Sequence, residues 1–427
     1  MPRFLRCAVA LCCALTAALG FVAPRPAAAS DDSFFDLQWN LAQIKAAEAW
    51  AASRGSGVTI GIVDTGVDVE HPDLRGKIEA TANCVGGTCR EGNAYDVHGH
   101  GTMVSGIAAA ATGNGRGVAG VAPDARLVVA KAIDDDGKGE VADINAAIRW
   151  VVDRGARVVN LSLGDPNFLV VSLLGTPLRP GIEYAWSRNA VPVLASGNEN
   201  LGVGGLGSSN YGSLNAVVVG ATDKSGGVAS YSSGIGNAKW GLVAPGGSAG
   251  GAGNDILSTF PQGRYAWVAG TSMAAPHVSG AVALLLAQGL SPSSAVERLL
   301  STADKASCGS GCRGRLNLAA AVGSSGAAPA ATAPRPTAPP EPTATTVRPR
   351  EARATTTTAP PEPTTTVPSP VDTTVPPEAT LAAAPYGLEA DLPRPRNSAV
   401  LALAVALVGG VGAAAGMVGW SRFRAGG

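Results

Sequence analysis

The chain has 427 residues, of which 46% are hydrophobic and only 15% are charged. This apolar content excludes a protein that is disordered throughout. Lysine plus arginine and aspartate plus glutamate each total 32, so the formal net charge is zero. Because there is no basic excess, we expect no nucleic-acid partner.

The N-terminus has the pattern of a secretory signal peptide over residues 1–29. A short basic start precedes the apolar run Ala8–Val22, and Ala27–Ala29 supplies the small residues that a signal peptidase requires. Ser30 is then the first mature residue. A buried N-terminal helix and a lipoprotein are the alternatives; Leu11 is too bulky for the usual lipobox.

The C-terminus carries a second apolar run, residues 397–421, which contains no charged residue. Ala399–Val418 alone matches the ~20 residues that a helix needs to cross a ~30 Å hydrocarbon core. We therefore expect a transmembrane helix, followed by a cytoplasmic tail at residues 422–427. Since the N-terminus is exported, the chain would be a single-pass protein of the cell membrane whose folded domain is extracytoplasmic. A soluble hydrophobic hairpin is the alternative.

Residues 323–396 form a low-complexity linker. Seventeen of the 30 prolines fall between Pro329 and Pro395, interleaved with threonine runs. This composition cannot bury a core, so we expect a disordered, extended stalk with polyproline II character. Such a stalk would hold a folded domain away from the membrane.

Four of the seven cysteines remain after removal of the signal peptide: Cys84, Cys89, Cys308 and Cys312. Export to an oxidising compartment favours disulfides. Four cysteines allow three connectivities, and we expect the local pairs Cys84–Cys89 and Cys308–Cys312. A four-thiolate zinc site is the rival interpretation.

Residues 30–322 alternate short apolar runs with amphipathic segments. The expected buried strands are Val58–Val63, Arg126–Ala132, Arg157–Leu163, Val191–Ala195 and Ala216–Gly220. The expected helices are Val141–Arg154, Glu183–Arg188, Ala275–Gln288 and a segment that begins at Pro292. This alternation indicates an α/β domain, with a doubly wound, mostly parallel sheet and helices on both faces. Active residues should lie at the carboxyl ends of strands or at helix starts.

Three glycine-flanked motifs carry the residue types of nucleophilic catalysis. Asp64 directly follows a strand, whereas His100 and Ser272 each begin a helical run. A hydroxyl needs a base near neutrality, which histidine supplies, and a buried carboxylate orients that imidazole. The helix start beneath Ser272 offers free N–H groups to a developing oxyanion. His98 competes for the role of base, but the Gly-Thr that follows the histidine belongs to His100.

The order Asp, His, Ser with these surroundings resembles the subtilisin-like serine proteases. Further matching motifs are Gln43–Ala46, His71–Leu74, Gly120–Pro123, Ala195–Glu199, Val243–Gly246 and Gly314–Asn317. The resemblance implies a serine endopeptidase that hydrolyses polypeptides through an acyl-enzyme and requires no cofactor for the chemistry. Ser272 would be the nucleophile, His100 the general base and then acid, and Asp64 the orienting carboxylate.

The same resemblance implies roles for further residues. Asn198 falls on the oxyanion-hole asparagine, and Asp31, Asp73 and Asn114 align with oxygen ligands of a structural calcium in some relatives. Ordinary surface residues are the alternative for the calcium set. The segments that flank the specificity pocket correspond to Ser162, Leu163, Gly164, Ala195, Ser196 and Gly197. None of these is acidic, so we expect no strict preference for Arg or Lys before the scissile bond, and a small or apolar residue there instead.

The whole architecture looks like that of mycosins, the membrane-anchored subtilases attached to type VII secretion systems. Only a short segment separates the signal peptide from the first strand, where many relatives carry a folding pro-domain. A type VII secretion complex is therefore an expected partner, and structural stabilisation of that complex is the alternative main role. An esterase is disfavoured because no Gly-x-Ser-x-Gly elbow surrounds Ser272. A stalked adhesin would have no use for the three catalytic motifs.

Overall fold

The computed structural model describes residues 30–163, 177–198, 212–323 and 381–383. The expected signal peptide and the expected membrane-spanning segment both lie outside these ranges, as does nearly all of the linker. Within them, no helix is both long and apolar enough to cross a bilayer.

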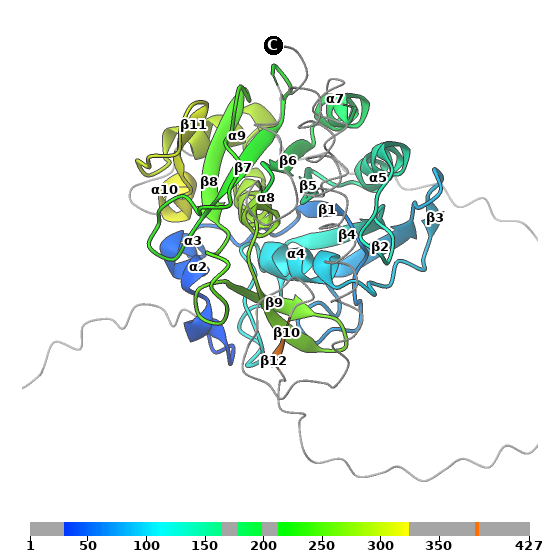
Figure 1. Ribbon diagram of the computed structural model, residues 1–427, viewed down its shortest axis with the longest axis horizontal. Coiled ribbons are helices and arrows are strands. Elements are labelled where there is room, and N and C mark those ends of the chain that lie inside the picture. The colour runs from blue at the N-terminus through cyan, green and yellow to red at the C-terminus, as the bar shows by residue number, and fades with distance from the viewer. Residues whose placement is uncertain (1–29, 164–176, 199–211, 324–380, 384–427) are drawn as a thin grey trace, which may run out of the picture. The chain divides into compact units, whose positions relative to one another are not determined.

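A nine-stranded sheet forms the centre of the domain (Figure 1). Its strands are β1 (Thr59–Asp64), β2 (Ile78–Asn83), β3 (Arg90–Glu91), β4 (Arg126–Lys131), β5 (Val158–Leu161), β6 (Val191–Ala195), β7 (Val217–Thr222), β8 (Trp240–Pro245) and β11 (Cys312–Arg315). Their order across the sheet is β11–β8–β7–β6–β5–β1–β4–β2–β3. All neighbours are parallel except β2 and β3, which are antiparallel.

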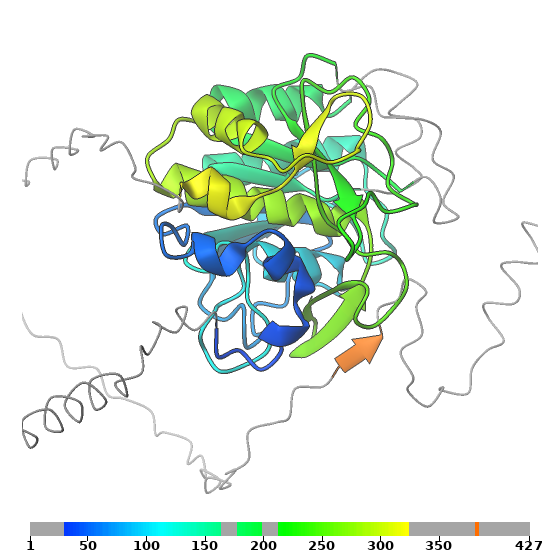
Figure 2. The same ribbon diagram turned by 90° about the vertical axis from the view of Figure 1, so that its left-hand side faces the viewer.

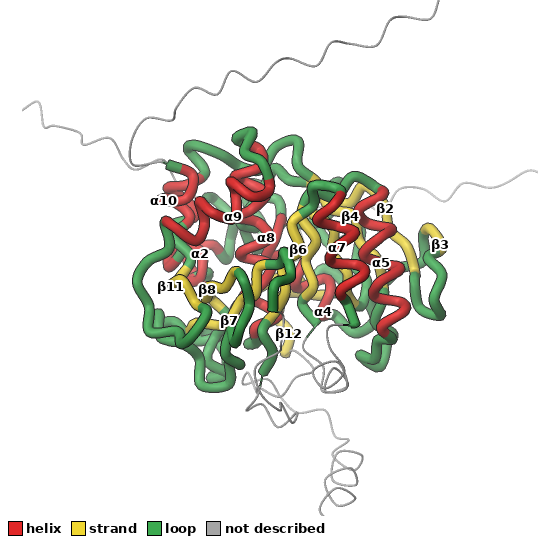
Figure 3. Tube along the Cα trace, turned by 90° about the horizontal axis from the view of Figure 1, so that it is seen from above, coloured by secondary structure: helices red, strands yellow, loops and turns green. Residues whose placement is uncertain are grey.

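Helices cover both faces of this sheet (Figure 3). Four of the helices that pack on it are α4 (His100–Ala109), α5 (Val141–Asp153), α7 (Arg179–Ser187) and α8 (Thr271–Ala287). Alternate residues of a strand point to opposite faces. In β1, Ile60 and Ile62 join the core that contains α4 and α8, whereas Val63 joins the core that contains α5 and α7. The expected α/β fold with helices on both faces is confirmed.

Short helices from the two ends of the domain pack together on the α8 side. They are η1 (Phe35–Leu37), α2 (Trp39–Gln43), α3 (Ala46–Ala49), α9 (Pro292–Ser301) and α10 (Leu318–Val322). Figure 2 shows the N-terminal helices beside α10, and the Leu318 N–H donates to the Ile44 carbonyl at 2.9 Å. Deeper in, Asn40 Nδ2 lies 2.8 Å from His277 Nε2. Burial lowers the pKa of His277 to about 4, so this contact joins α2 to α8 through a neutral imidazole.

A small second sheet supports the start of α4. Its strands are β9 (Ile256–Phe260), β10 (Arg264–Val268), antiparallel to β9, and β12 (Leu381–Ala383), parallel to β10. The hydroxyls of Ser258 and Thr259 donate to the carbonyls of Met103 and Thr102 at 2.8 and 2.7 Å. The hairpin therefore fixes the first turn of α4 from the side. β12 lies within residues 323–396, which were expected to be disordered throughout, but these three residues form a strand.

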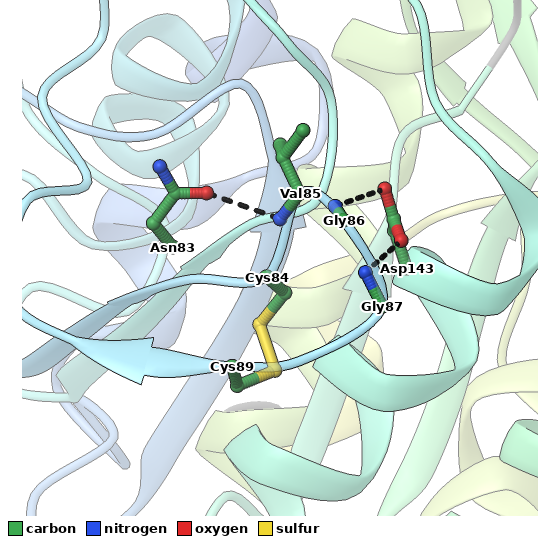
Figure 4. Close-up of a disulfide and its surroundings, with 7 residues drawn as sticks. All are labelled: Asn83, Cys84, Val85, Gly86, Gly87, Cys89 and Asp143. Carbon is green, nitrogen blue, oxygen red and sulfur yellow. Dashed lines mark hydrogen bonds between the residues drawn. A yellow bond between two sulfur atoms is a disulfide. The ribbon is translucent and has the colours of Figure 1, made fainter.

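Both expected disulfides form. Cys84–Cys89 joins the end of β2 to β3 (Figure 4), and Cys308–Cys312 lies at the start of β11. The local pairing is confirmed, and the zinc interpretation is wrong because all four thiols are used in these bonds.

Candidate active site

The carboxyl end of β1 places Asp64 at the centre of the sheet's catalytic edge. β1 pairs with β4 on one side and with β5 on the other. The first strand in the sequence therefore lies inside the sheet, and later strands were added on both sides of it. In a doubly wound sheet such a strand ends at the crevice where ligands bind. Asp64 is fully buried, and its Oδ1 accepts hydrogen bonds from the Thr65 N–H at 2.8 Å and from His100 Nδ1 at 2.7 Å.

Glycines on either side of His100 allow the start of α4 to approach this carboxylate. Gly99 has φ 97°, and a Cβ there would overlap the ring of Phe260. A Cβ on Gly101 would overlap the carbonyl oxygen of Gly66. Because Asp64 accepts from Nδ1, that nitrogen carries the proton, and His100 Nε2 keeps a lone pair that can accept one.

The electrostatic environment separates the two neighbouring histidines. Burial alone would lower the pKa of His100, but the charge and hydrogen bond of Asp64 outweigh it and raise the pKa above its ordinary 6.5. The His98 ring centroid lies 6.3 Å from that of His100. Burial, followed by the charge of His100, lowers the pKa of His98. The carboxylate partner favours His100 over His98 as the base.

The second position of α8 presents Ser272, which is 6% exposed. Pro276, one helical turn later, has no N–H to donate to the Ser272 carbonyl, which leaves that acceptor free. The Ser162 hydroxyl donates to it instead, at 2.7 Å. Ser162 in turn accepts from Asn160 Nδ2, and Asn160 Oδ1 accepts from the Ser279 hydroxyl, each at 2.8 Å. This buried chain of polar groups fixes the backbone of the nucleophile's turn.

Asn198 lies directly above the start of α8. Its Oδ1 accepts from both the N–H and the hydroxyl of Thr271, each at 3.0 Å, which fixes the orientation of the amide. A Cβ placed on Gly270 would lie 3.6 Å from Asn198 Nδ2 and 3.7 Å from the Ser272 nitrogen. Two nitrogen atoms that can donate therefore lie near one point beside the serine, as an oxyanion hole requires.

The residues expected to flank the specificity pocket divide into three groups. Gly164 lies outside the described residues. The hydroxyls of Ser162 and Ser196 point into the protein, since Ser196 donates to the Ser233 carbonyl at 2.8 Å. Leu163 packs against the α5 core, Ala195 ends β6, and the Gly197 N–H donates to the Thr271 hydroxyl at 3.2 Å. Backbone and apolar groups of these residues, rather than their hydroxyls, are left to meet a substrate.

The residues expected to bind calcium lie around one loop. Asp73 is buried and accepts from Asn114 Nδ2 at 3.1 Å, and Asp31 accepts from the Gly115 N–H at 3.1 Å. Asp32, which sequence reasoning missed, accepts from the Asn114 N–H at 3.0 Å. Burial raises the pKa of Asp73. Among the described residues no group of three or more His, Cys, Asp or Glu side chains is arranged to hold a metal ion.

One further buried carboxylate links the two motifs that carry Asp64 and His100. Asp96 accepts from the Thr65 hydroxyl at 2.8 Å, from the Gly99 N–H at 2.7 Å and from the Thr102 N–H at 2.7 Å. Sequence reasoning missed it, although an aspartate four residues before the candidate base was a usable signal. Asn160 was likewise visible as the one amide in an apolar strand.

This site has the three groups that a serine hydrolase needs: an imidazole hydrogen-bonded to a carboxylate, a serine at the start of a helix and an amide donor in a fixed orientation. The family model described as the subtilase family matches residues 55–323. The chain is 37% identical to thermitase of Thermoactinomyces vulgaris over 69% of its own length and 98% of thermitase. It is 38% identical to subtilisin BL of Lederbergia lenta over 58% and 84% of the two chains.

The solved structures agree with the sequence relatives. A protease from Pseudoalteromonas arctica PAMC 21717 superimposes with a TM-score of 0.60 at 30% identity, covering 69% of this chain and 99% of that one. The chain belongs to the subtilase family. It is a subtilisin-like serine peptidase, and the resemblance drawn from its three motifs is confirmed.

The raised pKa of His100 predicts the acid side of the pH–rate profile. A general base must be neutral, so kcat/KM should rise with pH through a midpoint above 6.5. In Asp64→Asn the charge that raises this pKa is gone, so the midpoint should move to lower pH while activity falls by about 10⁴-fold. Hydrolysis of a peptide nitroanilide between pH 5 and pH 9 measures both. An unchanged midpoint in the variant would contradict the assignment.

Proposed function

We propose that this protein is an exported, membrane-anchored endopeptidase in which Ser272, His100 and Asp64 form the catalytic triad. The observation that supports it best is the 2.7 Å hydrogen bond between His100 Nδ1 and the buried Asp64 carboxylate. That bond leaves His100 Nε2 free to accept a proton. His100 begins α4, and α4 packs against α8, the helix that begins at Thr271 and carries Ser272.

The mechanism follows from the groups at this edge. His100 Nε2 takes the proton of the Ser272 hydroxyl as its Oγ attacks the peptide carbonyl, and Asp64 stabilises the imidazolium. Asn198 Nδ2 and the Ser272 N–H hold the oxyanion; one such donor contributes about 3–4 kcal/mol to lowering the barrier. His100 then gives its proton to the leaving amine. Water, activated by the same imidazole, releases the acid from Ser272, and no step requires a cofactor.

The substrate is a polypeptide bound in extended form along the catalytic edge. This mode recognises the backbone first and side chains second. Since the segments beside the site contribute glycine, alanine, leucine and inward-facing serines, we propose a small or apolar residue before the scissile bond. The absence of an acidic side chain from Ser162–Leu163 and Ala195–Gly197 supports this choice.

Membrane anchoring is supported by the uncharged run at residues 397–421 and by the export signal at residues 1–29. The linker at residues 323–396 would then suspend the peptidase outside the cell membrane. This arrangement, with a single C-terminal span, favours a mycosin-like partner of a type VII secretion complex. In that setting the domain could also serve as a structural component of the complex.

A structural calcium ion is proposed at the loop that carries Asn114. Asp31, Asp73 and Asn114 offer hard oxygen atoms, which suit Ca²⁺. Asn114 Nδ2 donates to Asp73, and the N–H of the next residue, Gly115, donates to Asp31. In the present arrangement those oxygens accept N–H donors, so binding would require the Asn114 amide to turn its oxygen toward Asp73. The ion would brace the N-terminal segment and would supply no chemistry to the reaction.

A fluorophosphonate probe tests the nucleophile. It reacts with a serine that a base has activated, so the wild-type protein should be labelled and Ser272→Ala should not. Ser187→Ala, which alters an exposed serine of α7, is the matched control and should label as the wild type does. In-gel fluorescence after reaction reads out all three proteins. Equal labelling of Ser272→Ala and the control would refute the assignment.

Removal of calcium should lower thermal stability. An ion present at a hundred times its dissociation constant stabilises the folded state by about 2.7 kcal/mol. Chelation with EGTA should therefore lower the melting temperature of the wild type by roughly 5–10 °C. Asp73→Asn should melt at the same temperature with and without chelator. Superimposable melting curves of the wild type in calcium and in EGTA would reject this site.

Truncation tests the anchor. The full chain, expressed in a host that exports it, should stay in the membrane pellet after alkaline carbonate washing, because an apolar helix resists extraction. A chain that ends before Asn397 should appear in the medium and should still react with the probe. Recovery of both proteins in the same fraction would contradict the proposed anchor.

A further inference from the structure

The turn closed by the Cys84–Cys89 disulfide lies close to the catalytic edge, yet the proposed mechanism does not use it. It follows β2, which is separated from β1 by β4 alone. Cys84 is fully buried and belongs to the same hydrophobic cluster as Val63 of β1 and Ile144 of α5. The disulfide is therefore packed in the hydrophobic core between β1, which carries Asp64, and the start of α5.

The neighbouring segment, residues 132–140, connects β4 to α5 and begins at the triad itself. The N–H groups of Ala132 and Ile133 donate to the carbonyl oxygen of Asp64 at 2.9 and 3.2 Å. Just before it, Lys131 Nζ donates to the carbonyl of Thr65 at 2.6 Å. β1 and β4 end at the same edge, with Asp64 opposite Lys131, so we infer that an extended peptide whose scissile bond lies at the triad runs beside this segment. We call residues 132–140 the groove loop.

The disulfide turn holds the groove loop at both ends. Before the loop, the Cys84 N–H donates to the Lys131 carbonyl at 2.8 Å. After the loop, the N–H groups of Gly86 and Gly87 donate to the two carboxylate oxygens of Asp143 at 3.0 and 2.6 Å, as Figure 4 shows. Asp143 stands in the first turn of α5 and is 4% exposed, so its carboxylate oxygens need hydrogen-bond donors from the protein, and these two N–H groups supply them.

The crosslink supplies the rigidity that these contacts need. Gly86 and Gly87 have φ values of 91° and 84°, a conformation that glycine adopts readily but does not prefer over others. A turn with two adjacent glycines loses much conformational entropy when it is ordered. The Cys84–Cys89 bond removes most of that freedom before the turn meets Asp143.

We propose that the Cys84–Cys89 turn is a positioning device for the groove loop, which sets how tightly an extended peptide binds and leaves the triad unaffected. The inference rests on the peptidase function proposed above. Its acting groups are the Gly86 and Gly87 N–H donors, and Asp143 is the residue through which they hold the loop.

Paired disulfide variants of the full chain in detergent test this proposal. Cys84→Ser/Cys89→Ser removes the turn's crosslink, and Cys308→Ser/Cys312→Ser is the matched control. The control disulfide lies at β11, the first strand in the order across the sheet, whereas β2 and β3 are the last two. Each protein is assayed with a long peptide that extends several residues before the scissile bond and with a single-residue nitrophenyl ester. The ester reaches the triad but not the groove loop.

Of the two disulfide variants, only one should lose activity, and only with the long peptide. Cys84→Ser/Cys89→Ser should lose about tenfold in kcat/KM for the long peptide, through KM, which corresponds to ~1.4 kcal/mol of binding. Its ester hydrolysis should stay within about twofold of the wild type, a difference of only ~0.4 kcal/mol. The control should match the wild type on both substrates. Asp143→Ala, which keeps the disulfide, should reproduce the peptide-specific loss.

Several outcomes would overturn the proposal. Equal losses on peptide and ester would show that the turn supports the triad or the fold as a whole. Unchanged kinetics in both Cys84→Ser/Cys89→Ser and Asp143→Ala, or the same loss in the Cys308→Ser/Cys312→Ser control, would remove its basis. A wild type that hydrolyses neither substrate would refute the proposed function itself, which separates that failure from a failure of the inference.

Discussion

The hydrogen bond between Asp64 and His100 joins residues 36 positions apart in the chain, and much of the surrounding structure serves to maintain it. It places a carboxylate in a site from which water is excluded, where an ionised group is costly unless it is paired. Asp64 is paired because β1 ends where α4 begins, and the glycines beside His100 let the two backbones meet. The rest of the catalytic edge is arranged around that contact.

Two supports hold the contact, and a third holds the turn that carries the nucleophile. Asp96 ties the residue after Asp64 to the first turn of α4, and the β9–β10 hairpin fixes the same turn through the hydroxyls of Ser258 and Thr259. Beneath the nucleophile, Ser162 satisfies the carbonyl that Pro276 leaves without a helical partner. Each support uses a buried, fully bonded polar group, which makes the arrangement rigid.

The sequence could predict the features that depend on local pattern. The apolar runs that became β1, β4, β6 and β7 were located to within a few residues, because fully buried parallel strands are nearly continuous in apolar side chains. β2 was missed because it carries Glu79 on an exposed position and Thr81 and Asn83 on partly exposed ones, and so lacks that pattern. The periodic pattern of α8 was recognised only from Ala275, whereas the motif around Ser272 predicts a start within one residue of the observed Thr271, and Pro276 lies inside the helix.

The candidate site shows the same division. The order and surroundings of Asp64, His100 and Ser272 could be recognised from motifs, because catalysis demands those residue types there. The inward direction of the Ser162 and Ser196 hydroxyls could not, because it depends on which carbonyls the folded backbone leaves unbonded. The contacts of Asp143 with Gly86 and Gly87 join residues more than fifty positions apart, and no local pattern encodes them.

The most direct test of the central account is a crystal structure of the protein inhibited by a fluorophosphonate. The phosphorus should be bonded to Ser272 Oγ, and its charged oxygen should lie about 3 Å from both Asn198 Nδ2 and the Ser272 nitrogen. His100 should keep its hydrogen bond to Asp64 and turn Nε2 toward the adduct. An adduct oxygen that points away from Asn198, or a His100 ring separated from Asp64, would contradict the account.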